Sequence, residues 1–133
     1  MTIKVALAGA GAFGIKHLDG IKNIADVEVV SLISRDLEKT REVADKYGIP
    51  HVTTDLADSL AIKEVDAVIL CTPTQMHADQ SIACLKAGKH VQVEIPLADS
   101  LKGAADVVAL QKQTGLVAMC GHTRRFNPSH QYV

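Results

Sequence analysis

The feature that most constrains this chain is the junction between a short apolar run, Ile3 to Ala8, and the glycine cluster that follows it. The run lacks the alternation of a half-exposed strand and predicts a buried strand of a parallel sheet. Gly9, Gly11 and Gly14 come next in the pattern Gly-x-Gly-x-x-Gly. Beyond them, apolar residues recur at the spacing of a helix, at Ile15, Leu18 and Ile21. The order strand, glycines, helix is the one that a dinucleotide-binding turn requires.

Each glycine has a separate task in such a turn. Gly9 would form the tight bend, Gly11 would let the backbone approach a pyrophosphate, and Gly14 would let the helix pack closely on the strand. The free N–H groups at the start of the helix would then point at the phosphates. We therefore expect a cofactor-binding loop made of Gly9, Gly11, Ala12, Phe13 and Gly14. The alternative is a tight strand-to-helix turn in another kind of α/β protein.

The rest of the chain alternates between strands and helices. Further strands are predicted at Val27–Ser34, His51–Val52, Val65–Leu70, His90–Val93 and Val117–Cys120. Helices are predicted at Leu37–Tyr47, from Asp55 to Ala61, at Met76–Ala87 and at Ser100–Thr114, the last with Leu101, Ala104, Ala105 and Val108 facing inward. Repeated strand–helix units predict an α/β fold, a Rossmann-type doubly wound parallel sheet with right-handed crossovers.

The end of the second predicted strand bears on the choice of cofactor. An NAD site usually places Asp or Glu there, about 20 residues after the glycines, to bind the ribose 2′-hydroxyl. This chain has Ser34 and Arg35 instead. Arg35 can hold a 2′-phosphate through paired, charge-assisted hydrogen bonds, and Ser34 can donate another. The sequence therefore favours NADP over NAD, unless Arg35 is a solvated charge that faces Asp36 or Glu38.

The last residues differ in character from the repeated units. A polar, doubly basic segment follows the sixth predicted strand and runs from Gly121 to Pro128. Ligands of such sheets lie beyond the carboxyl ends of the strands. We expect residues 1–121 to form the dinucleotide-binding domain and residues 122–133 to begin a second, α+β sheet domain that this chain lacks. The alternative is a frayed tail.

Composition excludes several other classes. A net charge of −1 leaves no basic surface for nucleic acid, and no apolar run approaches the roughly 20 residues of a membrane span. The start does not have the pattern of a signal peptide, so we expect a cytoplasmic protein. Cys71, Cys84 and Cys120 are widely spaced and read as small buried apolar residues, with no disulfide and no metal site.

Two further motifs carry a resemblance. The segment Cys71–His77 reads Cys-Thr-Pro-Thr-Gln-Met-His, and the segment Ala87–Leu97 reads Ala-Gly-Lys-His-Val-Gln-Val-Glu-Ile-Pro-Leu. Together with the glycines, they resemble the Gfo/Idh/MocA family of oxidoreductases over essentially the whole chain. The resemblance implies that Thr72, Pro73 and His77 line the nicotinamide side of a cleft and that Glu94 lies near the ring. It also implies a C-terminal sheet domain that carries much of the substrate pocket, and we expect homo-oligomers to form through that domain.

One position departs from the family pattern. The family signature is Glu-Lys-Pro, whose lysine often assists proton transfer, and here that lysine is Ile95. An isoleucine cannot carry a proton, so the role is not transferred to this chain. Glu94 remains a candidate catalytic residue. The family motif aromatic-Asn-Arg-Arg is likewise His122-Thr123-Arg124-Arg125 here.

Within the family, these departures resemble an NADP-dependent branch that acts in the degradation of aromatic compounds. Its substrate is a dicarboxylate that is oxidised as a cyclic hemiacetal. Thr123, Arg124 and Arg125 would bind the substrate, since guanidinium groups pair with carboxylates. His122 is a candidate proton acceptor, although it could instead bind a carboxylate or be structural, and a base from the second domain is equally open. No function is assigned to His17, His51, His90 and His130.

Other functions stay open at this point. The chain could belong to a dehydrogenase of sugars or cyclitols, to a sensor that binds the dinucleotide without catalysis, or to a domain that binds CoA or flavin. Residues 1–133 alone are expected to bind the cofactor without turnover.

Overall fold

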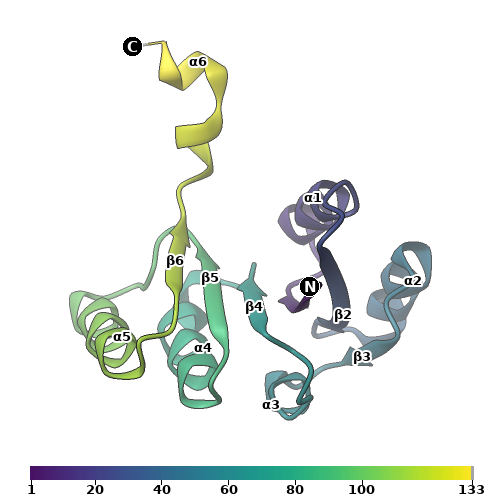
Figure 1. Cartoon of the computed structure of the whole chain (residues 1–133), viewed down its shortest axis with the longest axis horizontal. Coiled ribbons are helices and arrows are strands. Elements are labelled where there is room, and N and C mark those ends of the chain that lie inside the picture. Colours follow the sequence, from purple (N-terminus) through teal and green to yellow (C-terminus); the bar gives the residue numbers. More distant parts are fainter. Residues whose placement is uncertain (133) are drawn as a thin grey trace.

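The computed structural model describes residues 1–132 and places six strands in one sheet (Figure 1). The strands are β1 (Ile3–Ala8), β2 (Val27–Ile33), β3 (His51–Thr53), β4 (Ala67–Leu70), β5 (His90–Glu94) and β6 (Ala118–Gly121). Their order across the sheet is β3-β2-β1-β4-β5-β6, and every neighbouring pair is parallel. This is the strand order of a Rossmann fold. The predicted doubly wound α/β class is confirmed.

Helices cover both faces of the sheet and create two apolar cores. One face carries α1 (Ala12–Ile21) and α2 (Leu37–Tyr47), and the other carries α3 (Leu56–Leu60), α4 (Thr74–Lys86) and α5 (Leu101–Thr114). The first core contains Leu7, Leu18 and Leu32, and the second contains Val68, Leu85 and Val107. The chain crosses from the first half of the sheet to the second between β3 and β4, so the carboxyl ends of β1 and β4 lie side by side at the switch point.

Local sequence signals explain where the helices begin and end. Asp36, Asp55 and Ser100 each accept a hydrogen bond from a backbone N–H in the first turn of α2, α3 and α5. Gly48 and Gly115 end α2 and α5 in the left-handed conformation, at φ of 70° and 68°. The ends of these elements therefore differ from the predicted ones by two residues at most.

The predicted inward face of α5 is wrong. Leu101 is 88% exposed and Val108 is 44% exposed, whereas Val107 is 1% exposed and lies in the second core. Gly103 explains why a different face of α5 is buried, because a Cβ built on it would lie 3.0 Å from the Cβ of Ala78 in α4. The close contact of the two helices turns the face with Gly103 and Val107 inward.

A buried lysine joins two segments of the second half of the sheet near the points where β4 and β5 begin. Lys89, just before β5, is only 8% exposed. Its ammonium donates hydrogen bonds to the carbonyl oxygens of Ile62 at 3.0 Å and Val65 at 2.6 Å, with a longer one to Lys63 at 3.4 Å. These carbonyls belong to the turn between α3 and β4. Lys89 thus ties that turn to the start of β5.

The chain leaves the sheet at β6. A short 3-10 helix, η1 (Thr123–Phe126), and a single turn of helix, α6 (Pro128–Gln131), project beyond the carboxyl end of that strand (Figure 1). The side chains of this segment are exposed. The predicted domain boundary after Gly121 coincides with the end of β6, and the assignment of residues 122–133 to a second domain stays a prediction. Across residues 1–132, no helix has both the length and the apolar character that a membrane crossing demands.

Candidate functional site

The turn after β1 depends on the absence of two side chains. Gly9 has a φ of 104°, and a Cβ on it would lie 2.4 Å from the carbonyl oxygen of Cys71 at the end of β4. A Cβ on Gly14 would lie 1.8 Å from the carbonyl oxygen of Gly9 and 3.2 Å from Cδ2 of Leu7. These two glycines bring α1 tightly onto β1 at the switch point, in the tasks that the sequence predicts for them.

The start of α1 is open toward the outside. Gly11 is the N-cap residue, no side chain caps the helix, and its first turn contains no acidic residue. A Cβ on Gly11 would meet nothing within 4 Å, so the backbone here borders free space. Ala12 and Phe13 are exposed beside it. Free N–H groups at the start of a helix, with no carboxylate to occupy them, favour an anion such as a phosphate.

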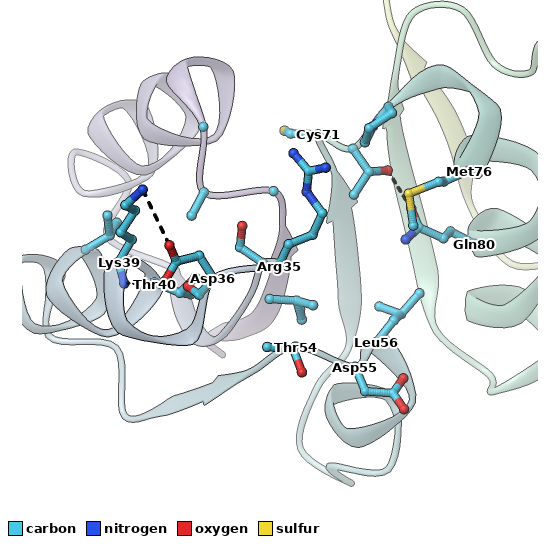
Figure 2. A pocket seen from close by; sticks show the side chains of 18 residues that line it. Arg35, Asp36, Lys39, Thr40, Thr54, Asp55, Leu56, Cys71, Met76 and Gln80 are labelled. Atoms are coloured by element: carbon cyan, nitrogen blue, oxygen red, sulfur yellow. Dashed lines mark hydrogen bonds and ion pairs between the residues drawn. The ribbon is translucent and has the colours of Figure 1, made fainter.

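A cleft of about 500 Å³ runs from this turn along the carboxyl ends of the first strands. Its walls come from the glycine turn, the end of β2, the first turns of α2 and α3, and the loop between β4 and α4 (Figure 2). Gly9, Gly11, Thr72 and Pro73 all line the cleft, at the ends of the neighbouring strands β1 and β4. The cleft therefore lies where a doubly wound sheet binds its ligands.

Ser34 and Arg35 line the cleft at the end of β2, and Figure 2 shows the Arg35 side chain extended into it. Within residues 1–132, Arg35 takes part in none of the ion pairs. Asp36 accepts a hydrogen bond from the backbone N–H of Lys39 instead, at 3.1 Å. That bond is the main cause of the lowered pKa of Asp36. The guanidinium is thus available to a ligand, and the alternative that it pairs with Asp36 or Glu38 is not favoured.

His77 is placed differently from Thr72 and Pro73. The residue is 2% exposed, and its ring nitrogens lie 2.7 Å from the carbonyl oxygens of Thr72 and Pro96. It joins the turn after β4 to the cis Ile95–Pro96 peptide. We therefore regard His77 as a residue that holds the wall of the cleft from behind, whereas the resemblance implied that it lines the cleft.

Glu94, the last residue of β5, lies next to a histidine that the sequence reasoning missed. Nε2 of His17 in α1 is 2.7 Å from Oε1 of Glu94. The thiol of Cys71 completes a group whose donor atoms all lie within 4.8 Å of one another. Burial, with a smaller contribution from Glu94, raises the pKa of Cys71 to about 12, so this thiol is neutral. A signal was available, since His17 follows Gly14 by three residues and so shares its face of α1.

This group offers donors that zinc accepts in proteins. The short separation of His17 and Glu94 is that of a direct hydrogen bond. Ligands of one tetrahedral zinc ion lie more than about 3 Å apart, given metal–ligand bonds of about 2.0–2.3 Å. The contact between these two side chains is therefore a hydrogen-bonded pair. The expectation of no metal stays a prediction.

The candidate substrate residues all lie in the projecting segment. His122, Thr123, Arg124 and Arg125 follow β6 and are exposed. Arg124 lies 3.5 Å from the ring of His130, and none of the four lines the cleft. The structure thus brings Gly9 and Gly11 of the predicted phosphate loop together with Ser34, Arg35, Thr72 and Pro73 in one cleft, and leaves the predicted substrate residues apart from them.

Comparison with known proteins agrees with this geometry. The Gfo/Idh/MocA profile, described as an oxidoreductase family with an NAD-binding Rossmann fold, matches residues 3–122. The chain is 67% identical to 4-carboxy-2-hydroxymuconate-6-semialdehyde dehydrogenase of Sphingobium sp. over 131 residues, which is 98% of this chain and 42% of that protein. The chain therefore spans less than half the length of this relative.

Solved structures of the same fold contain either cofactor. A scyllo-inositol dehydrogenase from Lactobacillus casei with bound NAD(H) and scyllo-inositol superposes with a TM-score of 0.93 at 27% identity, covering 99% of this chain and 39% of the other. A 3-ketoreductase from Actinomadura kijaniata in complex with NADP superposes with a TM-score of 0.91 at 26% identity, covering 99% and 42%. The fold alone therefore does not determine whether the cofactor carries a 2′-phosphate.

Proposed function

Because the chain belongs to the Gfo/Idh/MocA oxidoreductase family, we propose that it is the cofactor-binding part of an NADP-dependent dehydrogenase of one particular hemiacetal. The substrate is the cyclic form of 4-carboxy-2-hydroxymuconate-6-semialdehyde, and the product is 2-pyrone-4,6-dicarboxylate. The observation that carries this proposal is the 67% identity, over 98% of the chain, to the Sphingobium enzyme of that name. Such a protein takes part in the degradation of aromatic compounds.

The choice of NADP rests on the end of β2. Ser34 offers a hydroxyl where a carboxylate would repel a 2′-phosphate, and the guanidinium of Arg35 extends into the cleft beside it. The start of α1 binds the pyrophosphate through Gly11, Ala12 and Phe13. A bound NADP would supply the hydride acceptor for the carbon that is oxidised.

The substrate loses a hydride and a proton in this reaction. The hemiacetal carbon would give up its hydrogen as the hydride that NADP takes up, and the hydroxyl group would release its proton, which leaves the carbonyl of a lactone. Thr123, Arg124 and Arg125 bind the two carboxylates. His122 takes the proton, or Glu94 does so at the end of β5. Ile95 has no part in this transfer, because its side chain has no ionisable group.

The longer relatives suggest how this part is completed. We propose that residues 1–121 form the dinucleotide-binding domain and that residues 122–133 lead into a second domain with the rest of the substrate pocket, since this chain covers 42% of the Sphingobium relative. We propose that this second domain also mediates homo-oligomer formation and that the protein is cytoplasmic. No nucleic acid or membrane takes part in the activity.

The test is an assay of the full-length protein that carries this chain. The hemiacetal and NADP are mixed with the protein, NADPH is followed by absorbance, and the lactone is identified by chromatography. We expect equal amounts of NADPH and lactone, with far less NADPH from myo-inositol or scyllo-inositol. Faster turnover of an inositol would favour a cyclitol dehydrogenase, which the likeness to the Lactobacillus casei structure makes the second candidate. Cofactor binding without turnover of any of these would indicate a sensor.

A further inference from the structure

The pair formed by His17 and Glu94 joins two distant parts of the chain at the switch point. His17 lies in α1, the helix that begins at the glycine turn, and Glu94 ends β5, 77 residues later. The side chain of His17 is 19% exposed and that of Glu94 is 12% exposed. A short hydrogen bond between two largely buried polar groups holds both in one geometry, since breaking it would leave one of them without a partner.

The carboxylate of Glu94 lies beside β6, the last strand of the sheet. Gly121 of β6 is its partner in the parallel register. A Cβ on Gly121 would lie 3.4 Å from Oε1 of Glu94 and 3.3 Å from Nε2 of Gln92, so the missing side chain makes room for the carboxylate. Within residues 1–132, the bond from His17 is the only hydrogen bond that the Glu94 side chain makes. Its second oxygen, Oε2, makes no hydrogen bond to these residues.

The strand order indicates which part of a dinucleotide would lie near Glu94. Ser34 and Arg35 mark the adenosine end, beyond β2. A dinucleotide crosses the carboxyl edge of the sheet at the switch point, with its two halves on opposite sides of it. The nicotinamide then lies over the ends of β4, β5 and β6, where Cys71, Glu94 and Gly121 are.

We propose that His17 is a positioning residue that fixes Glu94 toward the nicotinamide, and that the fixed carboxylate makes the protein bind the oxidised cofactor in preference to the reduced one. This inference rests on the proposed function, because it needs a nicotinamide dinucleotide in the cleft. The oxidised ring carries a positive charge and the reduced ring carries none. A carboxylate held in a partly buried site attracts the charged ring more strongly than a mobile, solvated carboxylate does.

The test measures the dissociation constants of NADP⁺ and NADPH for the protein and four variants by calorimetry. Glu94→Gln keeps the shape of the side chain and removes its charge. It should weaken the preference for NADP⁺ over NADPH by about tenfold. His17→Leu removes the hydrogen bond and should shift the preference in the same direction by about threefold or more. His17→Gln keeps an N–H at the place of Nε2 and should stay within about twofold of the wild type.

The fourth variant separates a positioning role from a merely structural one. Val107→Ala opens a cavity in the second core, on the far face of the sheet, and should lower the melting temperature without changing the preference. An unchanged preference in both Glu94→Gln and His17→Leu would overturn the inference. A weaker preference for NADP⁺ in Glu94→Gln together with an unchanged preference in His17→Leu would overturn it as well. A wild-type protein that binds neither NADP⁺ nor NADPH would overturn the proposed function as well, which distinguishes the two failures.

Discussion

The two halves of the sheet meet at the switch point, and each is held together in a different way. In the first half, the contacts that shape the turn are between backbones, with Gly14 against the carbonyl of Gly9 and Gly9 against the carbonyl of Cys71. In the second half, buried polar side chains reach backbone carbonyls. Lys89 ties the turn after α3 to β5, and His77 ties the turn after β4 to the Ile95–Pro96 peptide.

The difference shows where each half tolerates change. A backbone contact leaves no room for a methyl group, so the first half is constrained at its glycines. A side-chain anchor leaves buried carbonyls without donors when it is removed, so the second half is constrained at two polar residues. The first half supplies most of the lining of the cleft, and we expect its substitutions to alter cofactor binding as well as stability. Substitutions of the second-half anchors should alter stability first.

Gly14→Ala should have a larger effect on stability and cofactor binding than Lys89→Met or Gly121→Ala. Its Cβ would lie 1.8 Å from the carbonyl oxygen of Gly9, and both atoms belong to backbone that cannot turn aside. We expect a loss of about 3 kcal/mol or more in the free energy of unfolding, together with loss of detectable cofactor binding. Denaturant unfolding and calorimetric titration measure the two quantities.

Gly20→Ala is the matched control on the same helix. A Cβ there would meet nothing within 4 Å, so alanine should raise the stability by about 0.5–1 kcal/mol and leave cofactor binding unchanged. If Gly14→Ala binds the cofactor as tightly as Gly20→Ala, the close backbone contact at Gly14 is not what shapes the cofactor-binding turn.

Lys89→Met should have the next largest effect, and on stability alone. Methionine fills the space of the side chain but leaves the carbonyls of Ile62 and Val65 without their donor, at a cost of about 2 kcal/mol. Lys86→Met is the control, because Lys86 is exposed at the end of α4. Unfolding by urea and cofactor titration should show a destabilised Lys89→Met protein with nearly unchanged affinity. A large loss of affinity at equal stability would show that Lys89 acts on the cleft.

Gly121→Ala should have the smallest effect, although it makes the same chemical change as Gly14→Ala. The nearest atoms to its Cβ are the ends of the Gln92 and Glu94 side chains, at 3.3 Å and 3.4 Å, and such atoms can move. We expect the free energy of unfolding to change by less than about 1 kcal/mol. A loss as large as that of Gly14→Ala would mean that the second half is also limited by backbone contact.

The same difference explains what could be read from the sequence. The glycine pattern predicted the turn, because only glycine meets the steric demand at Gly9 and Gly14. The doubly wound parallel sheet followed from the alternation of strands and helices. In contrast, Lys89 and His77 have no local pattern that separates a buried anchor from a surface residue, since their partners are carbonyls far along the chain. Periodicity also misplaced the inward face of α5, because the deciding contact is between Gly103 and Ala78 in another helix.

The residues of the candidate site also differ in whether the sequence predicts their position. Ser34 and Arg35 could be placed in the cleft from their distance to the glycines. The pair of His17 and Glu94 could not, because 77 residues separate its members and only the folded sheet brings them together. His122, Thr123, Arg124 and Arg125 rest on the resemblance and on the chemistry of their side chains.

We expect the cleft to select a dinucleotide with a 2′-phosphate through Arg35. Calorimetric titration of the protein with NADPH and with NADH tests it most directly, alongside Arg35→Ala and the control Arg41→Ala, an exposed α2 residue outside the cleft. We expect NADPH to bind about ten- to a hundredfold more tightly than NADH. Arg35→Ala should remove most of that difference and Arg41→Ala should keep it. NADH binding as tight as NADPH binding in the wild type would show that Arg35 does not select the 2′-phosphate.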